Sequence, residues 1–568
     1  MRLLEFHIHN YRNLDSISVK FASESAYIVG ENNIGKSNLL NAISTVLSGK
    51  RFSEEDFLDV NKSIQTFFSL ELDDIEIGLF DDFTDPLNEH RVNIVASQES
   101  PDDYIVYTHL ESNENIPKNA LRRLLVIYYD SLRNPRIELD FHKGKGAGSV
   151  LNYIVRCFIS KQTEEIHYLN EEAITDLEKY TSNILSHISA SGRFGIVPKI
   201  EKNDQELLSR LLVLRDTNNI DISSTGYGVQ YCMLVVLSIL EKIITFAKRK
   251  YSEELQNLKA ILIFDDPEIH LHPYLQRALM HDILRIAKGC DEDFNAILKE
   301  MFGVESFNAQ LIFATHSPYV ISNDYHQIIR LYNSEDTVKA ISACELDQAI
   351  SQPEKKQLDL QYDTIKEAVF ARGVIIVEGQ SERDSFKYFA NTMGYDLDAE
   401  GIGIVFAEGA ESIPGLQKLF EALKIDNVSI MDRDKETTYG ATVKNLYYTQ
   451  TMCFDHEIVH TLVSHNAYSL MKSIISSIDS KAMNKVLQAD MINKGFKKCK
   501  LPCTQVSKSY KLSDLAENNP LYEPIYTAWF SHAKGASAGK IIGMSLPLEC
   551  IPESYKNVIN TIIRLVRR

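Results

Sequence analysis

The sequence has few of the features that mark membrane, secreted or zinc-stabilised proteins. Its eight cysteines are scattered over 568 residues, and only Cys499 and Cys503 lie close together, without the paired Cys-x-x-Cys spacing of a zinc site. No apolar run approaches the ~18–20 residues of a membrane span. The first ten residues alternate as a strand does and lack the apolar core of a signal peptide. We therefore expect a cytoplasmic protein with reduced thiols and no membrane partner.

An excess of basic charge, a common mark of nucleic-acid binding, is missing from the chain as a whole, which carries a net charge of −18. Residues 481–568 nevertheless hold fourteen Lys and Arg against six Asp and Glu, a net charge of +8, which leaves −26 on residues 1–480. A basic tail can follow a phosphate backbone, or it can be an ordinary solvated surface.

A glycine-rich loop lies near the N-terminus between an expected strand and an expected helix. Gly30-x-x-x-x-Gly35-Lys36-Ser37 follows the apolar run Ala26–Val29. The glycines would let backbone N–H groups surround a β-phosphate at the start of the helix. Lys36 would reach the β- and γ-phosphates, and Ser37 would bind Mg²⁺. The loop predicts a nucleotide site.

Two later strands end in residues that suit the same site. The apolar run Ala260–Phe264 leads into Asp265, which suits the Mg²⁺ shell, and Asp266, which suits orientation of the attacking water. The run Leu311–Ala314 is followed by His316, a candidate γ-phosphate sensor.

Between the loop and these strands, residues 223–230 form a Ser/Gly-rich turn before an apolar helical run from Cys232 to Leu240. Such a turn offers a second anion cradle, although Ser and Gly also form plain caps and turns.

Acidic residues also follow strands in the second half of the chain. The apolar, mostly β-branched run Val374–Val377 leads into Glu378, and Glu382 follows one helical turn later. A later apolar run ends in Asp432 and Asp434. Adjacent strand ends of a parallel sheet would place these four carboxylates in one crevice. Carboxylates so close repel one another unless cations lie between them, and Mg²⁺ or Mn²⁺ suits an oxygen-rich site. The pattern predicts a metal-dependent site that cuts phosphodiesters.

The order of motifs in residues 1–340 resembles an ABC-type ATPase head of the SMC and RecF kind. In such heads two copies enclose two ATP molecules, and the signature turn of one copy contacts the γ-phosphate held by the other. The resemblance implies a homodimer or higher homo-oligomer with ATP as cofactor. It places these residues near the nucleotide: Arg12, Asn33, Gly35, Lys36, Ser37, Asn38, Ser224, Gly226, Gly228, Asp265 and His316.

The same resemblance puts Asp266 at the catalytic position, where the family usually has Glu. Misplacing a water-orienting group by about 1 Å can cost on the order of 10²-fold in rate, so we expect slow turnover and a gating role for ATP.

Glu378-Gly-x-x-Glu382 with Asp432-x-Asp434 resembles the TOPRIM fold of topoisomerases, primases and some nucleases. An ATPase head followed directly by TOPRIM is similar to the OLD (overcoming lysogenization defect) family of ATP-dependent nucleases, which includes Gabija and retron-associated members. The resemblance implies a further acid, for which Glu457 is the candidate, and a late lysine, Lys534 or the nearby Lys540. The expected metal ligands of this site are Glu378, Glu382, Asp432, Asp434 and Glu457.

This resemblance implies DNA as substrate and a role in defence against phage. Nucleases of this family occur alone, beside a helicase or beside a reverse transcriptase, so the resemblance leaves open whether this chain has such a companion. Two cations about 4 Å apart would activate water and stabilise the leaving oxygen, and Lys534 would offset charge in the transition state. A clamp or repair factor of the SMC/RecF type, without cleavage activity, is the alternative. A topoisomerase is disfavoured because we find no helix-turn-helix domain carrying a nucleophilic Tyr.

The expected fold is α/β, with six segments. They are 1–150, the first part of the ATPase head; 151–215, a helical insertion for dimerisation; 216–345, the second part of the head; 346–370, a linker; 371–465, the TOPRIM domain; and 466–568, a helical, basic C-terminal segment that completes the nuclease domain.

Overall fold

The computed structural model describes most of the chain as two compact units. One contains Met1–Leu3, Leu40–Glu54 and Phe67–Thr315, and the other contains Leu4–Leu39, Glu55–Thr66 and His316–Arg568. The residues outside the description are 22–23, 79, 81–82, 86, 122–123, 132–146, 161–171, 173–174, 177, 180–225, 248–256, 336, 349, 441–443, 503–504 and 568. Most of the predicted insertion, and Ser224 of the predicted signature, lie outside the described residues.

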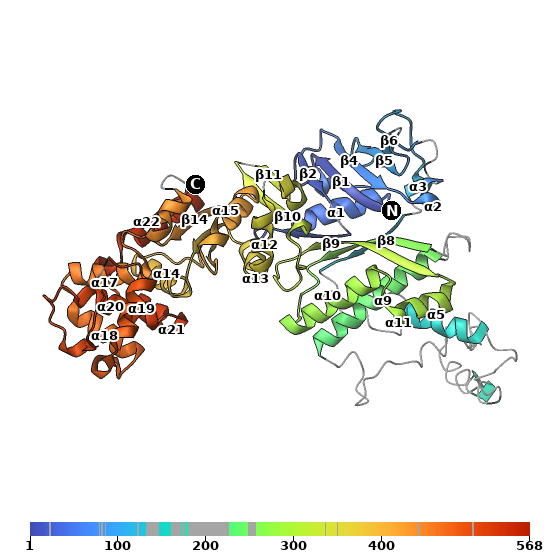
Figure 1. The fold of residues 1–568 in the computed structure, drawn as a ribbon. Helices are drawn as coiled ribbons and strands as arrows, with labels where there is room; N and C mark the ends of the chain where they lie inside the picture. Colours follow the sequence, from blue (N-terminus) through green and yellow to red (C-terminus); the bar gives the residue numbers. More distant parts are fainter. Residues whose placement is uncertain are drawn as a thin grey trace, which may run out of the picture. The chain divides into compact units, whose positions relative to one another are not determined.

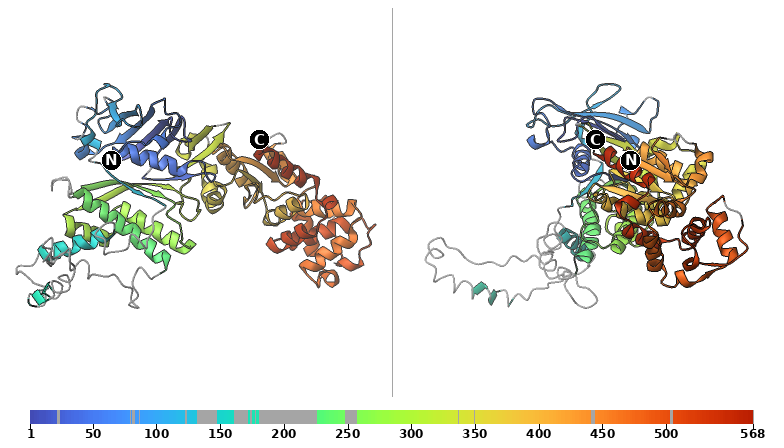
Figure 2. Two further views of the ribbon diagram at one scale, coloured as in Figure 1. Left: turned by 180° about the vertical axis from the view of Figure 1, so that it is seen from behind. Right: turned by 90° about the vertical axis from the view of Figure 1, so that its left-hand side faces the viewer.

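The first unit contains three parallel strands in the order β9-β8-β7. The apolar runs 260–264 and 311–314 are buried without interruption, as expected for parallel strands covered on both faces, whereas residues 125–129 alternate between buried and half-buried positions. The strands are β7 (Leu125–Tyr129), β8 (Asn257–Asp265) and β9 (Ser306–Ala314), and the main helices beside them are α5 (Ala147–Ser160), α9 (Tyr227–Ala247), α10 (Pro273–Ala287) and α11 (Glu292–Phe302) (Figures 1 and 2).

Helix α9 extends well beyond the apolar run Cys232–Leu240 from which we predicted it. Its window Gln230–Ala247 is long and apolar enough to cross a membrane by length and composition, whereas we expected no run of that length. The window is 59% buried inside the protein, and the helix packs against α5 and β7. We interpret α9 as a core helix of this unit.

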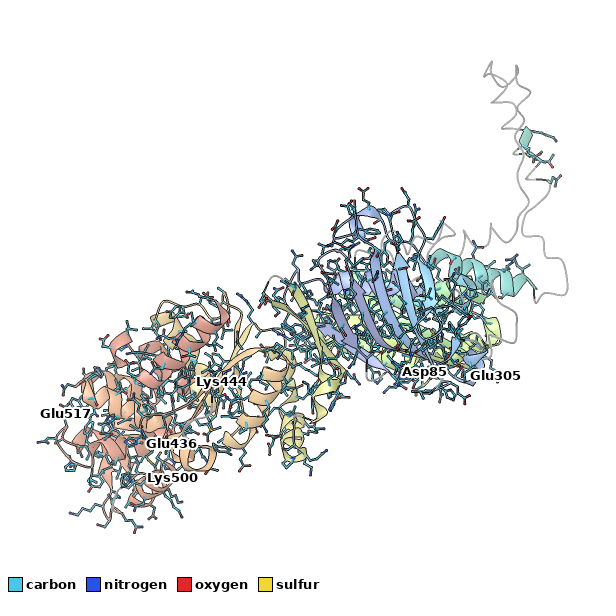
Figure 3. The ribbon with its side chains drawn as sticks, turned by 90° about the horizontal axis from the view of Figure 1, so that it is seen from above. Asp85, Glu305, Glu436, Lys444, Lys500 and Glu517 are labelled. Atoms are coloured by element: carbon cyan, nitrogen blue, oxygen red, sulfur yellow. The ribbon has the colours of Figure 1, made fainter. Side chains whose placement is uncertain are left out.

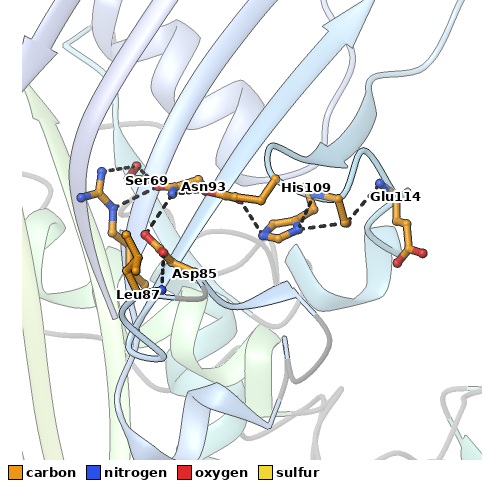
Figure 4. A network of polar contacts seen from close by, with 9 residues as sticks. Ser69, Asp85, Leu87, Asn93, His109 and Glu114 are labelled. Carbon is orange, nitrogen blue, oxygen red and sulfur yellow. Dashed lines mark hydrogen bonds and ion pairs between the residues drawn. The ribbon is translucent and has the colours of Figure 1, made fainter.

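Strands β4 (Ile64–Glu71), β5 (Arg91–Gln98) and β6 (Val106–His109) lie side by side in that order, and β5 is antiparallel to β6. Figure 4 shows the polar network that joins them. Asn93 accepts hydrogen bonds from Ser69 and Arg91 and donates to Glu111. The network supplies partners for side chains that would otherwise be costly to bury. Short helices α2 (Asp74–Ile77) and α3 (Lys118–Leu121) complete this region.

The second unit contains the strand before the phosphate loop. Strand β3 (Ser25–Val29) runs parallel to β10 (Ile328–Ser334), which pairs antiparallel with β11 (Thr337–Ser342). Strand β1 (Arg2–His9) pairs antiparallel with β2 (Ile17–Lys20). Helix α1 (Lys36–Leu47) begins within the phosphate loop, as the sequence predicts.

A second sheet in this unit has four parallel strands in the order β13-β12-β14-β15. They are β12 (Gly373–Val377), β13 (Ile402–Phe406), β14 (Asp426–Met431) and β15 (Leu446–Tyr448). Because β12 and β14 are neighbours and parallel, the residues after their carboxyl ends meet at one edge. A Cβ on Gly373 would lie 2.5 Å from the Val566 side chain, so this glycine lets the C-terminal helix pack closely on the sheet.

The rest of this unit is helical. Residues 346–370, expected as a linker, hold two helices that pack against the sheet region. Residues 466–568 are helical as predicted, with one short hairpin of β16 (Val486–Leu487) and β17 (Tyr510–Lys511), and Figure 3 labels Lys500 and Glu517 there. The helices are α12 (Gln352–Leu360), α13 (Tyr362–Ala368), α14 (Gln380–Thr392), α15 (Ile413–Ala422), α16 (Glu436–Tyr439), α17 (Phe454–Ser464), α18 (Tyr468–Ile478), α19 (Ala489–Lys498), α20 (Tyr522–His532), α21 (Ala536–Ser545) and α22 (Glu553–Val566).

Candidate active site

The phosphate loop has the backbone geometry that its glycines suggest. Gly30 and Gly35 have φ of +145° and +111°, angles that residues with a Cβ rarely adopt. A Cβ on Gly30 would lie 2.5 Å from the carbonyl oxygen of Leu331. Lys36 is buried, and its ammonium group donates to the carbonyl oxygens of Gly30 and Glu31 at 3.0 and 2.8 Å. The loop therefore fits a bound phosphate chain.

Other residues predicted near the nucleotide lie around this loop. Arg12 donates from Nε to Asp56 at 2.9 Å and from a terminal nitrogen to Asn38 at 2.7 Å. Ser37 is the second residue of α1, and Asn33 is exposed with φ of +64°. The structure thus brings Arg12 and Asn38 into direct contact beside the loop.

In the first unit, the predicted acids stand at the end of β8. Asp265 is buried and accepts a hydrogen bond from the Tyr128 hydroxyl at 3.3 Å. Asp266 has φ of +45°, and its N–H donates to the carbonyl of Ala314 at the end of β9. Glu268, which was not among the predicted site residues, accepts a hydrogen bond from Thr315 at 2.7 Å.

The remaining predicted nucleotide residues are placed as follows. His316 is exposed, just beyond β9. Gly226 and Gly228 lie at the start of α9, and a Cβ built on Gly226 meets no atom of the described residues within 4 Å.

At the edge where β12 and β14 end, acidic residues surround a cavity of about 570 Å³. Glu378 follows β12, Glu382 lies in the first turn of α14, and Asp432 follows β14; all three line the cavity. The Asp432 N–H donates to the Glu378 carboxylate at 3.3 Å, and Asp432 accepts from the N–H of Phe454 at 3.0 Å. The structure therefore brings three of the four predicted acids together, two of them 54 residues apart in sequence, whereas Asp434 does not line this cavity.

Glu382 is held in one orientation by two donors. The Gly379 N–H donates to one carboxylate oxygen at 2.6 Å, and the Tyr555 hydroxyl donates to the other at 3.2 Å. Burial, reinforced by the Glu378 carboxylate, raises the pKa of Glu382 to about 8. Burial and the carboxylates of Glu382 and Glu378 also raise the pKa of Asp432 well above its usual value. A divalent cation between these carboxylates would favour their charged forms and so lower the pKa values of Glu382 and Asp432.

Lys534, and not Lys540, lines this cavity. Its ammonium nitrogen lies 2.8 Å from Asp455 Oδ2, and the exposed fraction is 38% for the Lys534 side chain and 2% for Asp455. Although burial opposes the charged form, Asp455 raises the pKa of Lys534, so the lysine stays charged. Lys540 lines a separate cavity of about 540 Å³.

Glu457, the predicted further acid, is oriented differently from Asp455. It is buried and accepts hydrogen bonds from Ser554 and from the N–H of Gln450, and it does not line the acidic cavity. Burial raises the pKa of Glu457 to about 7. Asp455, two residues earlier on α17, is the acid that contacts Lys534.

Close packing of α14 and α21 places Lys534 beside Glu382. A Cβ on Gly539 would lie 2.3 Å from the carbonyl oxygen of Ser381, so only glycine allows this approach. Ser385 donates to the carbonyl of Gly539 at 2.9 Å, and the N–H of Gly535 donates to Ser381 Oγ at 3.1 Å.

The donors present fit a hard divalent cation. Glu378, Glu382 and Asp432 offer carboxylate oxygens on one cavity wall. Asp434 Oδ2 lies 2.6 Å from the Lys500 ammonium nitrogen, while its buried Oδ1 has no hydrogen-bond partner among the residues that the structure describes. All of these donors are carboxylate oxygens, the ligand type that Mg²⁺ and Mn²⁺ prefer.

Comparison with known proteins agrees with this division into a nucleotide part and an acidic part. Residues 26–322 match the family model described as "AAA domain, putative AbiEii toxin, Type IV TA system", and residues 369–434 match "Overcoming lysogenization defect protein-like, TOPRIM domain". The chain is 24% identical over 470 residues to the OLD nuclease of Thermus scotoductus, an alignment that covers 76% of this chain and 82% of that protein. It is 21% identical over 505 residues to Endonuclease GajA of Bacillus cereus, covering 74% and 72%.

The chain belongs to the OLD family of nucleases. It is an enzyme with an ATPase module and a TOPRIM nuclease domain, which use ATP and divalent metal. Among solved structures, the SMC head bound to the C-winged helix domain of ScpA matches 62% of this OLD-family chain and all of that chain, at 14% identity and a TM-score of 0.34.

Proposed function

We propose that this OLD-family chain is a DNA endonuclease that uses Mg²⁺ or Mn²⁺ and cuts by nicking or double-strand cleavage. The observation that carries the proposal is the single cavity lined by Glu378, Glu382, Asp432 and Lys534 at the carboxyl ends of β12 and β14. Hydrolysis of a phosphodiester requires carboxylates that can bind two cations and a nearby positive group, here the lysine, that can bind a phosphate oxygen. The proposed metal ligands are Glu378, Glu382, Asp432 and Asp434.

The chain's own groups orient these parts. Divalent cations, when bound, supply Lewis acidity toward the phosphodiester and its attacking water. Lys534 faces the cavity with a charged ammonium group that can bind a phosphate oxygen, and Asp455 holds that group in place at 2.8 Å. Tyr555 and the Gly379 N–H hold the Glu382 carboxylate, so little reorganisation is needed when DNA binds. We assign Asp455 a positioning role and Glu457 a supporting one.

ATP regulation is the second part of the proposal, and contacts within the second unit support it. Arg330, on β10 beside β3, is buried and donates to the carbonyl oxygens of Leu423, Lys424 and Ala371 at 2.8 to 3.1 Å. Those carbonyls precede β14 and β12, the strands that carry the acids.

The phosphate loop has a direct contact with the same strand region. Arg372 Nε lies 3.6 Å from a carboxylate oxygen of Glu31, which is in the loop. The Glu31 carbonyl accepts a hydrogen bond from Lys36. If Lys36 moved to bind the phosphates of ATP, this bond would break, and the contact between Glu31 and Arg372 beside β12 would change.

Relatives named as nucleases, one of them an endonuclease, support DNA as the proposed substrate. We further propose assembly into a homodimer or higher homo-oligomer through the ATPase parts, and a role in defence against phage beside a companion helicase or reverse transcriptase. An ATP-gated DNA clamp that does not cut is the competing function, in which the acids would hold only structural metal.

Purified protein incubated with supercoiled plasmid tests the proposal. We expect nicked or linear DNA in Mg²⁺ or Mn²⁺, and none in EDTA. Adding ATP, or a non-hydrolysable analogue, should change the rate in the wild type and leave a Lys36→Ala variant unaffected. Intact plasmid under every metal and nucleotide condition, with DNA binding retained, would favour the clamp.

A further inference from the structure

Two cysteines and an aspartate meet beside the acidic cavity. Cys453 precedes the first residue of α17, Asp455 lies in its first turn, and Cys499 follows α19. One ligand atom from each, two sulfurs and a carboxylate oxygen, lie within 4.8 Å of one another. All three side chains are at least nine-tenths buried. The cysteines are 46 residues apart, so their meeting depends on the packing of two helices.

The donor chemistry of this cluster differs from that of the acidic cavity. Thiolates are soft donors that select Zn²⁺ and similar ions, whereas Mg²⁺ takes oxygen ligands. In a tetrahedral zinc site with Zn–S of about 2.3 Å, the ligand atoms lie about 3.8 Å apart. The three ligand atoms lie within 4.8 Å of one another, so each needs to move by about 1 Å or less to coordinate a single ion.

We propose that Cys453, Asp455 and Cys499 bind a thiophilic divalent cation of the Zn²⁺ class, which inhibits cutting by drawing Asp455 away from Lys534. The charge balance permits binding. Before it, two thiols, one carboxylate and the lysine sum to zero. As the ion enters, both thiols release protons to solvent, and the ion, two thiolates, carboxylate and lysine again sum to zero.

The position of the cluster explains why occupancy should affect the nuclease. Lys534 lies 2.8 Å from the Asp455 carboxylate, so an ion that takes this oxygen removes the lysine's partner. Cys453 also precedes Phe454, whose N–H holds Asp432. Phe454 and Lys534, which adjoin Cys453 and Asp455, line the acidic cavity, so the cluster lies next to it. The inhibition rests on the proposed nuclease function, whereas the binding does not.

Binding is tested with Co²⁺ as an optical probe of the reduced full-length protein, because sulfur-to-cobalt charge-transfer absorption arises only with thiolate ligands. We expect one equivalent of this signal in the wild type and in Glu378→Ala. Cys453→Ser and Cys499→Ser should lose it. Cys550→Ser, a buried cysteine outside the cluster, is the matched control and should keep it. Absence of the signal in the wild type, or its survival in both cluster variants, would overturn the site.

Inhibition is tested by plasmid cutting in excess Mg²⁺ with increasing Zn²⁺, expressed as the ratio to the same variant without Zn²⁺. Changes to partners of metal ligands alone cost about 10–100-fold in affinity, so losing a ligand should raise the half-inhibiting Zn²⁺ concentration at least tenfold. Equal sensitivity of wild type and Cys499→Ser would place inhibition at the acidic cavity and refute the proposal. If the wild type does not cut in Mg²⁺, the proposed function fails while the Co²⁺ spectra still decide the binding site.

Discussion

Replacing Glu382 with glutamine should make the metal-free protein more stable while removing its activity. Burial raises the pKa of Glu382 from 4.5 to about 8, so between these pH values the folded state holds a proton that the unfolded chain has released. Stability in the absence of metal therefore falls as pH rises from about 4.5 to about 8 and then levels off. Glutamine carries no such proton. It can still accept from the Gly379 N–H and donate to the Tyr555 hydroxyl.

The size of the effect follows from the pKa difference. One pKa unit corresponds to about 1.36 kcal/mol, so the Glu382→Gln gain should be on the order of 3–5 kcal/mol at pH 8 and near zero at pH 4.5. Mg²⁺ should stabilise the wild type more at pH 8 than at pH 6, because the cation and the protons compete for the same carboxylates. The variant should lose most of that stabilisation.

The assay is unfolding by heat or denaturant in EDTA and in Mg²⁺, at pH 6 and pH 8. Glu408→Gln is the matched control, since Glu408 is an exposed carboxylate on the same cavity, and it should behave as the wild type in EDTA. The reasoning is refuted if Glu382→Gln is less stable than the wild type in EDTA at pH 8. It is also refuted if the variant keeps the full stabilisation by Mg²⁺.

Two further predictions concern the framework of the site. Gly539→Ala should destabilise the protein by about 1–3 kcal/mol and slow DNA cutting, because the added Cβ would lie 2.3 Å from the Ser381 carbonyl oxygen. Denaturant unfolding measures the change in stability, with Ser537→Ala at an exposed position of the same helix as the control. If Gly539→Ala is as stable as the wild type, α14 and α21 do not pack as closely as the structure shows. Arg330→Lys should retain cutting in Mg²⁺ but bring the ratio of cutting rates with and without ATP toward one. The compact ammonium group of lysine cannot reproduce the planar guanidinium that donates hydrogen bonds to three carbonyl oxygens. If a folded Arg330→Lys protein keeps the wild-type ratio of cutting rates with and without ATP, Arg330 does not couple the nucleotide site to the nuclease site.

The strand-end acids could be predicted because their signal is local. Runs such as Val374–Val377 are short, β-branched and apolar, and a carboxylate directly after such a run has to lie at the edge of a buried parallel sheet. The pairing of β12 with β14 then follows from the fold that the motifs resemble. The same reasoning correctly placed the phosphate loop between strand β3 and helix α1, which begins at Lys36.

Side-chain orientation on helices could not be predicted in this way. Asp455 and Glu457 are two positions apart on α17, so they point to different faces, and only the packing of α17 shows which one meets Lys534. The choice between Lys534 and Lys540 depended on the approach of α21 to α14, which Gly539 permits. Cys453 and Cys499 looked scattered because their contact joins two helices.

The most direct test of the central claim is the initial rate of plasmid nicking in Mg²⁺ by a folded Glu378→Ala protein, beside wild type and Glu411→Ala. Glu411 is an exposed acid that does not line the cavity. The account predicts a loss of about 10²-fold or more for Glu378→Ala and none for Glu411→Ala, the scale seen when one group that stabilises transition-state charge is removed. Nicking by Glu378→Ala at the wild-type rate would contradict it.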